Sequence, residues 1–533
     1  CHRQLCFHLG DEGILREMGK VEKNRLRVGK MSYGMVLLPS MISLEASTLE
    51  LLLQAAEAGI PLVSLGAFPE MVEGEKSLEL KRLRMQTQFP APDELDRLLA
   101  SYGFNRVTAR HKDNSRATEI AAAIRHFKSH TAYVLMNSRR HEPADIHLQL
   151  RDPRPLVLLN LDNLQLTAAD STATQEGREL FLHFGPAQTM VLIAAEDLTA
   201  KAPVKLPEQI LPLKEEWRVS AMTDNALTLD KCCYQLAGDT NWRPETEVCE
   251  LMEQLVARRY EGGLRMCFRF EIREMPDPAA LRLVCESVEK REIWINGILF
   301  DGKPDGWFVD KSFRTLAAGR LFREGINEIE ISTRFHQTED FYRAYDNKAD
   351  RMEVEKNMRT YDTELESLYV IGPFGVYSNG TFIQGEKNSL FSDGPFYIGA
   401  KPQIVRQGSL TEQGFLCFSG SLTLEQTVVW DGVPVRIELA PPYAAVLRLT
   451  VNGQEAGEWL WDVGPLDVTP YLRRGENRIA ITLVSGNRNL LGPFHMKDGE
   501  CYQVEPDSFS RSFMGDGWRE GYSFVKFGLR ELS

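Results

Sequence analysis

The chain has 533 residues, which is too long for one hydrophobic core, so several domains are expected. Its 75 acidic residues outnumber its 62 basic residues and give a net charge of −13, which argues against a nucleic-acid partner, because binding to the phosphate backbone draws on clustered Lys and Arg. No apolar run approaches the ~18 residues that a membrane-spanning helix needs, so we expect no membrane partner.

The nine cysteines follow no spacing pattern, and several, such as Cys267, lie in apolar, strand-like sequence. Free buried thiols in a reducing compartment explain this distribution, so we expect a cytoplasmic protein. Cys1, His2, Cys6 and His8 are of the residue types that bind metals, but no second cluster accompanies them. We therefore expect no metal and no cofactor.

Residues 1–115 predict an α/β domain. A short buried strand at 35–38 ends at Pro39, a helix with a broad apolar face runs from Ser43 to Ala58, and 61–66 is the next buried strand. Strands that alternate with helices indicate a mainly parallel sheet of flavodoxin-like type. There is no Gly-x-Gly-x-x-Gly, Walker lysine or nucleophile elbow, so a structural module is the simplest interpretation and a hydrolase that uses Ser40 is the alternative.

Residues 116–205 predict a small β-sandwich. A short helical stretch is expected around 117–127, and several short strands follow, with Pro, Gly and Asp between them. These strands are expected at 131–137, 146–150, 156–159, 180–184 and 190–193. A stiff linker is then marked by Pro203, Pro207 and Pro212.

A phrase that occurs twice organises the rest of the chain. Each copy has an alternating strand that ends in Asn-Gly, a variable crossing, and Gly-x-Asn at the start of a final alternating strand. The turns are Asn296-Gly297 and Asn452-Gly453, and the Gly-x-Asn stretches are 325–327 and 475–477. An internal repeat predicts two copies of one β-sandwich. We place them at 206–400, with a charged helical insertion at 340–366, and at 401–533.

The repeated phrase resembles the sugar-binding domain of glycoside hydrolase family 2, a galactose-binding-like jelly roll. Four further stretches resemble, in order, the C-terminal half of the large α-L-rhamnosidase-like glycoside hydrolases of family 106. They are Val-Gly-Lys-Met-Ser-Tyr-Gly-Met-Val-Leu-Leu-Pro at 28–39, Asn-Ser-Arg-Arg at 137–140 with Ala-Asp-Ile at 144–146, Asn-Ala-Leu-Thr-Leu-Asp at 225–230, and Leu-Tyr-Val-Ile-Gly-Pro-Phe-Gly-Val at 368–376.

This resemblance implies a glycosidase in which a catalytic (β/α)8 barrel precedes a flavodoxin-like domain and several β-sandwiches. A barrel takes ~250 residues, and this chain opens on the sequence expected after it. The family's paired catalytic carboxylates belong to the barrel, so no catalytic residue is assigned here. We expect an accessory, non-catalytic portion of such an enzyme, acting on plant or microbial glycans, with carbohydrate and an upstream catalytic barrel domain or subunit as partners. A free-standing carbohydrate-binding or scaffold protein without hydrolase activity is the alternative.

The candidate substrate-binding residues lie in the second repeat. Trp459, Trp461 and Asp462 combine aromatic faces with a carboxylate, which are common sugar contacts, although core or edge tryptophans beside a loop acid explain them as well. Arg488 follows the last strand of the repeat, in a loop that also contains His495. That loop is expected either to contact a ligand or to be solvated.

Overall fold

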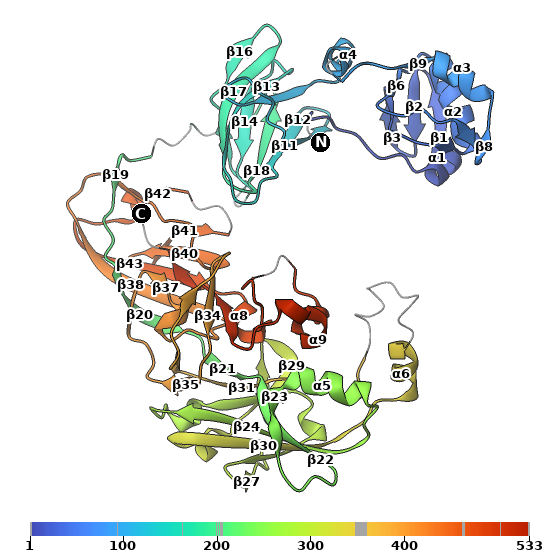
Figure 1. Cartoon of the computed structure of the whole chain (residues 1–533). Helices are drawn as coiled ribbons and strands as arrows, with labels where there is room; N and C mark the ends of the chain where they lie inside the picture. The colour runs from blue at the N-terminus through green and yellow to red at the C-terminus, as the bar shows by residue number, and fades with distance from the viewer. Residues whose placement is uncertain are drawn as a thin grey trace. The chain divides into compact units, whose positions relative to one another are not determined.

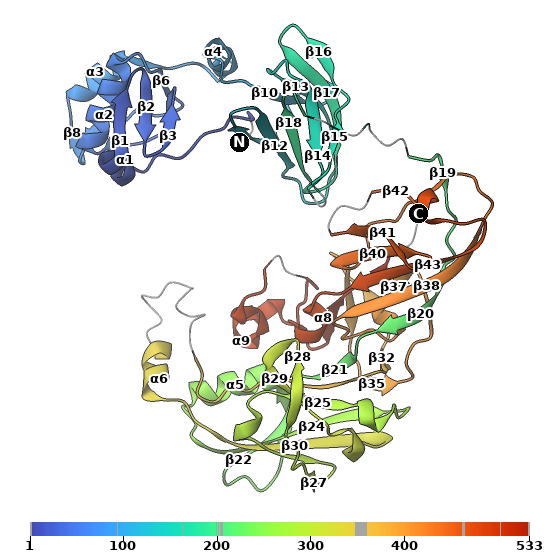
Figure 2. The ribbon, with the colours of Figure 1, turned by 180° about the vertical axis from the view of Figure 1, so that it is seen from behind.

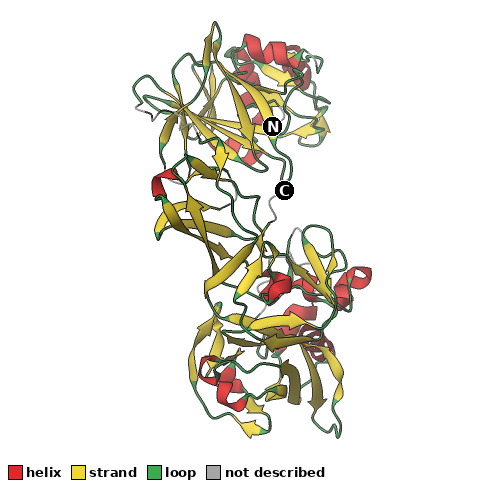
Figure 3. Cartoon of the chain, turned by 90° about the vertical axis from the view of Figure 1, so that its left-hand side faces the viewer, coloured by secondary structure: helices red, strands yellow, loops and turns green. Residues whose placement is uncertain are grey.

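The structure is a computed structural model that describes residues 3–92, 94–161, 164–198, 200, 202, 206–346, 360–460, 464–500 and 503–530. Strands make up most of its regular secondary structure (Figure 3). The chain divides into two units, Cys1–Lys205 and Leu206–Ser533. Within the described ranges, no helix is both long enough and apolar enough to cross a membrane.

The first unit contains a small α/β body. Its parallel sheet has the order β4-β6-β9, formed by Val36–Leu38, Leu62–Ser64 and Thr87–Gln88. The predicted helix is present as α2 (Ala46–Glu57), but Ser43 does not begin it, because Ser43–Leu44 form strand β5 and Glu45 is the N-cap. The remaining elements are α1 (Glu12–Met18), β1 (Gly19–Glu22), β2 (Arg25–Val28), β3 (Met31–Tyr33), β7 (Met71–Val72), β8 (Glu75–Lys76), α3 (Glu79–Met85) and α4 (Leu95–Ser101). The α/β alternation is thus confirmed, and its flavodoxin-like type stays a prediction.

A two-sheet β-sandwich completes the first unit (Figure 2). One sheet has the order β10-β13-β17-β16, formed by Val107–Arg110, Ala144–Leu150, Gly177–Phe184 and Thr172–Thr174. The other has the order β11-β12-β18-β14-β15, formed by Ile120–His126, Thr131–Asn137, Thr189–Ala194, Leu156–Leu159 and Leu166–Ala168. Leu135, Leu148 and Leu192 are fully buried in its core.

The helix expected around 117–127 is wrong. Residues 120–126 form β11, which pairs with β12 along its whole length, from Ile120 opposite Asn137 to His126 opposite Thr131. Three consecutive alanines favour a helix in isolation, but intrinsic propensity is a weak preference that sheet pairing and core packing override.

The second unit holds two larger sandwiches (Figure 1). In the first, one sheet has β23 (Arg243–Glu247), β22 (Lys231–Leu236), β24 (Gly262–Ile272), β30 (Gly325–Phe335), β26 (Glu292–Ile295) and β27 (Ile298–Leu299), extended by β35 (Phe396–Gly399) and β32 (Gly375–Ser378). The facing sheet has β21 (Asn225–Leu229), β31 (Leu368–Gly372), β25 (Arg282–Cys285), β29 (Asp310–Leu316) and β28 (Pro304–Phe308). Helix α5 (Val248–Ala257) packs into their common core.

The second sandwich is built around a six-stranded sheet. Its strands are β36 (Ile404–Arg406), β20 (Glu216–Met222), β38 (Ser421–Trp430), β43 (Gly475–Val484), β40 (Val446–Val451) and β41 (Gln454–Trp459). A small sheet of β19 (Gln209–Ile210), β39 (Val435–Ile437) and β42 (Leu466–Asp467) accompanies it. The remaining strands and α-helices of the second unit are β33 (Ile383–Gln384), β34 (Ser389–Ser392), β37 (Gly408–Ser409), β44 (Tyr522–Val525), β45 (Gly528–Leu529), α6 (Glu339–Asp346), α8 (Arg488–Leu491) and α9 (Arg511–Met514). The β-sandwich architecture expected from the sequence is confirmed.

Some predicted features lie partly outside the described residues. Of the helical insertion expected at 340–366, α6 is present, 347–359 lies outside them, and 360–366 forms no helix, so the prediction is wrong there. Pro203 of the expected linker also lies outside the described residues. The domain boundary expected at residue 400 stays a prediction. Strand β20 belongs to the sheet of β38, and Phe415 and Phe418 pack in the core of the second sandwich, whereas Leu416 and Cys417 pack in that of the first. The two sandwiches therefore interlock within one unit.

The repeated phrase forms the same buried hydrogen-bond network in each sandwich. In the second, the Asn477 side chain is buried, and its amide donates to the Arg473 and Gly475 carbonyls at 2.7 and 2.8 Å. Its Oδ1 accepts from the Arg473 N–H and from the Asn452 amide at 2.9 and 2.8 Å. The hydrogen-bonding capacity of this amide is thus filled.

The network of the first sandwich repeats this arrangement with Asn327 and Asn296. Asn327 donates to the Arg323 and Gly325 carbonyls at 2.7 and 3.1 Å and accepts from the Arg323 N–H and the Asn296 amide at 3.0 and 2.9 Å. Asn296 and Asn452 have φ values of 51° and 53°, the left-handed conformation that asparagine tolerates at such turns. Each turn is therefore bonded to the final strand of its own sandwich.

We expect Asn477→Ala and Asn327→Ala each to lower the free energy of unfolding by about 2–4 kcal/mol, because each removes a buried side chain together with its four hydrogen bonds. Urea-induced unfolding followed by tryptophan fluorescence measures the loss. Asn241→Ala, at an exposed position, is the control and should stay within about 0.5 kcal/mol of the wild type. Equal stability of all three variants would show that the buried asparagines are dispensable.

Candidate functional site

The predicted site residues have structural contacts wherever they are described. Trp459 is buried in the core of the second sandwich, and its Nε1 donates to the Gly464 carbonyl at 3.1 Å. Trp461 and Asp462 lie outside the described residues. Arg488 lies 3.1 Å from Glu500 and donates to the Ser523 carbonyl at 3.4 Å. Trp459 therefore supports a core, whereas Arg488 anchors the C-terminal segment.

A different group of residues concentrates buried charge in the second unit. We call it the His495 cluster, and it comprises Asp230, Lys231, Glu247, Glu250, His495, Trp518 and Tyr522. Its members come from the junction of β21 and β22, from the start of α5, and from the C-terminal segment. Segments far apart in the sequence thus meet at one place.

His495 lies at the centre of the cluster, and only 5% of its surface is exposed to solvent. Its Nδ1 donates to the Gly521 carbonyl at 3.1 Å, which leaves Nε2 directed to the carboxylates. Nε2 is 3.4 Å from Asp230 Oδ2 and 3.8 Å from Glu247 Oε1. The Trp518 ring stacks on the imidazole with 4.6 Å between ring centroids. The imidazole therefore occupies the gap between two carboxylates.

The remaining members of the cluster hold those carboxylates in place. The Tyr522 hydroxyl donates to Asp230 Oδ1 at 2.8 Å, and burial, reinforced by the Asp230 charge, raises the pKa of Tyr522 well above its ordinary value. Burial also acts to raise the pKa of Glu247, but Lys231, 3.2 Å away, together with His495 lowers it overall. Glu247 therefore remains ionised at neutral pH.

Glu250 lies one helical turn beyond Glu247 and titrates in the opposite direction. Burial raises its pKa, and the neighbouring Glu247 carboxylate raises it further. Carboxylates whose pKa values move apart are typical of acid–base sites. A glycosidase, however, needs open space between its two carboxylates for a sugar or a water molecule. Here the Lys231 ammonium forms an ion pair with Glu247, and the Gln254 amide donates to Glu250 at 3.2 Å. We therefore interpret the arrangement as a structural ion network.

A cavity of about 420 Å³ adjoins the cluster, and we call it the C-terminal cavity. It is connected to the cluster through Met496, which follows His495 and forms a β-bridge with Trp518. It is lined by Met496, Gln503, Glu505, Asp507, Ser508, Phe513 and Met514. The lining combines apolar side chains, including the 69%-exposed Phe513, with carboxylate, amide and hydroxyl groups.

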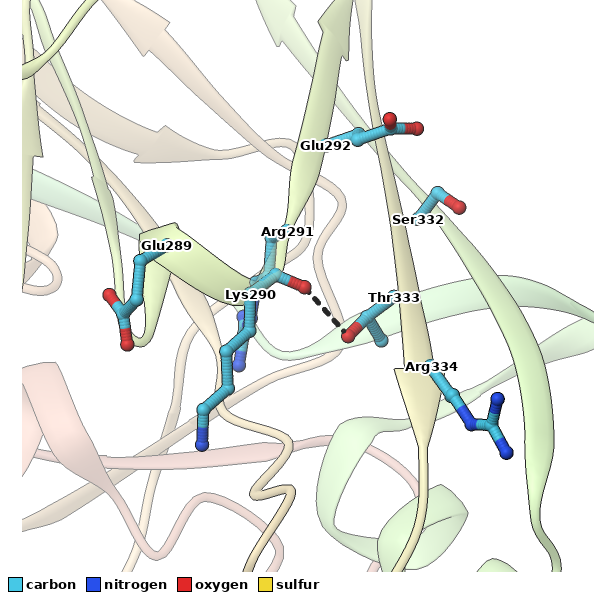
Figure 4. A pocket seen from close by; sticks show the side chains of 7 residues that line it. All are labelled: Glu289, Lys290, Arg291, Glu292, Ser332, Thr333 and Arg334. Carbon is cyan, nitrogen blue, oxygen red and sulfur yellow. Dashed lines mark hydrogen bonds between the residues drawn. The ribbon is translucent and has the colours of Figure 1, made fainter.

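A second hollow, of about 380 Å³, is lined by residues 289–292, at and before the start of β26, and by residues 332–334 of β30 (Figure 4). Thr333 Oγ1 donates to the Lys290 carbonyl at 3.0 Å across it. Its cations bind acceptors of the chain itself, because Lys290 and Arg291 donate to the carbonyls of Asp362 and Glu364 at 3.0 Å, and Arg334 pairs with Glu261. These three cations already have partners within the chain, so they are less available to a ligand than the identity of the lining residues indicates.

Sequence patterns gave one partial signal for the cluster. Asp230 ends the Asn-Ala-Leu-Thr-Leu-Asp stretch at 225–230, and His495 lies in the loop that the sequence marked for ligand contact or solvation. The structure shows His495 buried rather than solvated. Glu247, Glu250 and Tyr522 carry no local motif. Among the described residues, no group of three or more His, Cys, Asp or Glu side chains is arranged to hold a metal ion.

No protein-family model matches this sequence, and no curated protein matches it. The similar solved structures are glycoside hydrolases of low identity and low TM-score. A rhamnosidase from Novosphingobium sp. PP1Y is 15% identical, with a TM-score of 0.29, over 67% of this chain and 35% of that one.

Two further solved structures are similar to this chain. A β-D-mannosidase from Dictyoglomus thermophilum is 13% identical, with a TM-score of 0.19, over 49% of this chain and 31% of that one. A β-glucuronidase from Ruminococcus gnavus is 10% identical, with a TM-score of 0.21, over 52% of this chain and 46% of that one. This chain covers less than half the length of each of the three structures.

Asp230→Ala should destabilise the second unit by about 3 kcal/mol, because it leaves the buried Tyr522 hydroxyl and His495 Nε2 without their acceptor. Tyr522→Phe removes only one hydrogen bond and should lower the free energy of unfolding by about 1–2 kcal/mol. Urea-induced unfolding of both variants tests this order. A smaller loss for Asp230→Ala than for Tyr522→Phe would contradict the central place of Asp230.

Glu366, which precedes β31, predicts a pH dependence of stability. Burial raises its pKa to about 7, and the Glu364 and Glu286 carboxylates add to the shift. The folded chain therefore binds more protons than the unfolded chain between the ordinary pKa of 4.5 and pH 7, so the free energy of unfolding falls as pH rises through this range.

Glu366→Gln should remove this dependence and raise the free energy of unfolding at pH 8 by up to about 3 kcal/mol, with little change at pH 4. Unfolding curves at the two pH values provide the measurement, with the exposed Glu292→Gln as control. A gain of the same size at both pH values would indicate a packing effect instead of a titration.

Proposed function

We propose that this chain is the accessory, carbohydrate-directed portion of an α-L-rhamnosidase-like glycoside hydrolase and contains no catalytic centre of its own. The observation that carries the proposal is the engagement of the cluster carboxylates. Asp230 binds Tyr522 and His495, and Glu247 binds Lys231, so neither is available as a nucleophile or a general acid. The ordered sequence resemblance and the repeated asparagine network support the same assignment.

The C-terminal cavity is the place where we propose that the second unit contacts a glycan. A sugar presents an apolar ring face together with several hydroxyl groups. Phe513 offers an exposed aromatic surface, and the Asp507 carboxylate, which lines the same cavity, is a strong acceptor for hydroxyl hydrogens. Pockets that combine apolar walls with a few polar groups are typical of small-molecule sites.

In this proposal the chemistry belongs to an upstream catalytic barrel domain or subunit, and the glycans are of plant or microbial origin. The sandwiches, of galactose-binding-like type, would hold the polysaccharide or shape the substrate cleft of that barrel. Our alternative is a free-standing carbohydrate-binding protein. It predicts the same sugar contacts without the barrel, and an affinity purification that recovers no barrel-containing partner would favour it.

The purified chain should release no nitrophenol from 4-nitrophenyl α-L-rhamnopyranoside above the buffer rate, and Glu247→Gln and Glu250→Gln should not change this result. Turnover that survives purification and disappears in either variant would overturn the non-catalytic assignment. Turnover that is unchanged in both variants would indicate that the chain has an active site that uses neither Glu247 nor Glu250.

Binding is tested separately from turnover. The full chain, probed with an array of neutral and acidic plant and microbial oligosaccharides, should be retained by at least one of them. Failure to bind any member of the array, by a chain shown to be folded, would contradict a carbohydrate-directed function. The catalytic and binding halves of the proposal can therefore fail independently.

A further inference from the structure

The outer face of the β10-β13-β17-β16 sheet in the first unit carries an unusual set of side chains. The sheet register pairs His147 with Phe181 and Asp145 with His183, and it places Glu179 opposite Gln149. Side chains at alternate positions of a strand share one face, so these residues lie on the face opposite the buried Leu148 and Leu180. Two imidazoles and two carboxylates therefore surround one aromatic ring.

Phe181 is 75% exposed, which is unusual for a large aromatic side chain within a strand. The His147 ring stacks on one side of it, with 4.8 Å between centroids and 24° between ring planes. Strand β16 pairs only with Gly177–Glu179. Among the described residues, no strand therefore lies beside Phe181 on the side away from β13.

The two carboxylates around this ring each have a partner on the same face. His147 Nε2 lies 3.4 Å from Glu179, and His183 Nδ1 lies 2.8 Å from Asp145. Lys112 Nζ approaches Asp145 at 3.6 Å, and the hydrogen bond from His183, followed by the Lys112 charge, lowers the pKa of Asp145. Each carboxylate nevertheless keeps lone pairs beside an exposed aromatic ring, so the face suits an occupant that combines an apolar surface with hydroxyl groups.

We propose that this face binds a glycan through one 6-deoxyhexose ring, and we call it the Phe181 platform. The proposal rests on the proposed function in taking carbohydrate as the ligand, but it places a further site in the other unit. A 6-deoxyhexose has a methyl group next to its ring C–H groups, which enlarges the apolar surface that can cover Phe181. Its hydroxyl groups donate to free lone pairs of Glu179 and Asp145, since a carboxylate accepts several hydrogen bonds.

The chain supplies a matched control for this site. Phe127, in the turn between β11 and β12 of the same sandwich, is 57% exposed and stacks on His130 with 4.5 Å between centroids. It reproduces the exposed phenylalanine and the imidazole stack. It lies outside the sheet face that carries Asp145 and Glu179.

The test is an NMR titration of the full chain with methyl α-L-rhamnopyranoside. Phe181→Ala should weaken binding at the platform at least ten-fold, Phe181→Trp should retain or strengthen it, and Phe127→Ala should stay within two-fold of the wild type. Phe513→Ala, in the C-terminal cavity, reports separately on the site assigned under the proposed function.

Each outcome decides between the two sites. If Phe181→Ala leaves binding unchanged and Phe513→Ala abolishes it, the platform is overturned and the carbohydrate function stands. If only Phe181→Ala reduces binding, the result supports the Phe181 platform and contradicts the sugar site proposed at the C-terminal cavity. No binding by the folded wild type overturns the platform. A wild-type dimer that Phe181→Ala converts to a monomer would show instead that the open edge of β17 meets a second copy of the chain, which also overturns it.

Discussion

The asparagine pair of each sandwich, in which Asn327 or Asn477 is the buried member, is the constraint on which the second unit depends. Asn452 sits in a turn with positive φ, and its amide reaches the amide of Asn477 at the start of the final strand. A buried amide with unfilled hydrogen-bonding positions is costly, so this pair fixes which turn faces which strand. A one-residue slip between β40 and β43 would break the pair and turn the apolar side chains of one strand outward. Asn296 and Asn327 impose the same register in the other sandwich.

The stretch 225–230 connects these sandwiches to the C-terminal segment. The Asn225 amide donates to the Phe374 and Gly414 carbonyls at 3.0 and 2.8 Å, and Thr228 Oγ1 donates to the Leu490 carbonyl at 2.8 Å. Asp230 then accepts from Tyr522. One six-residue stretch thus bonds to segments that lie 149 to 292 positions further along the chain. The His495 cluster is the end of this series, which explains why its carboxylates are committed to the fold.

The sequence predicted the parts of the fold that depend on local pattern. Alternating apolar strands and two Asn-Gly turns were sufficient for two sandwiches, because a period of two and a turn with positive φ leave few other structures. The stretch at 117–127 predicts a helix from its local sequence, whereas the pairing of 120–126 with β12 is decided by the sandwich core. The candidate site could not be predicted from local sequence, because its members meet only after the chain has folded. These members are Asp230, Glu247, His495 and Tyr522. Trp459 and Arg488 looked like ligand contacts, but an isolated tryptophan or arginine gives no local sign of whether the fold already uses it.

Catalysis and recognition make different demands on a carboxylate, and our proposal for this chain concerns recognition. Glycoside cleavage needs two carboxyl groups in opposite protonation states, with room for a sugar between them. Recognition needs only acceptor lone pairs beside an exposed apolar surface, so a carboxylate that is paired inside the protein can still serve. Glu179 and Asp145 are paired, yet they flank an exposed ring. A single ring stacked on a phenylalanine gives a weak contact, but a polysaccharide repeats its sugars. In our proposal, successive sugars of one polymer can bind the Phe181 platform in turn, so a polymer should be retained more strongly than a single sugar.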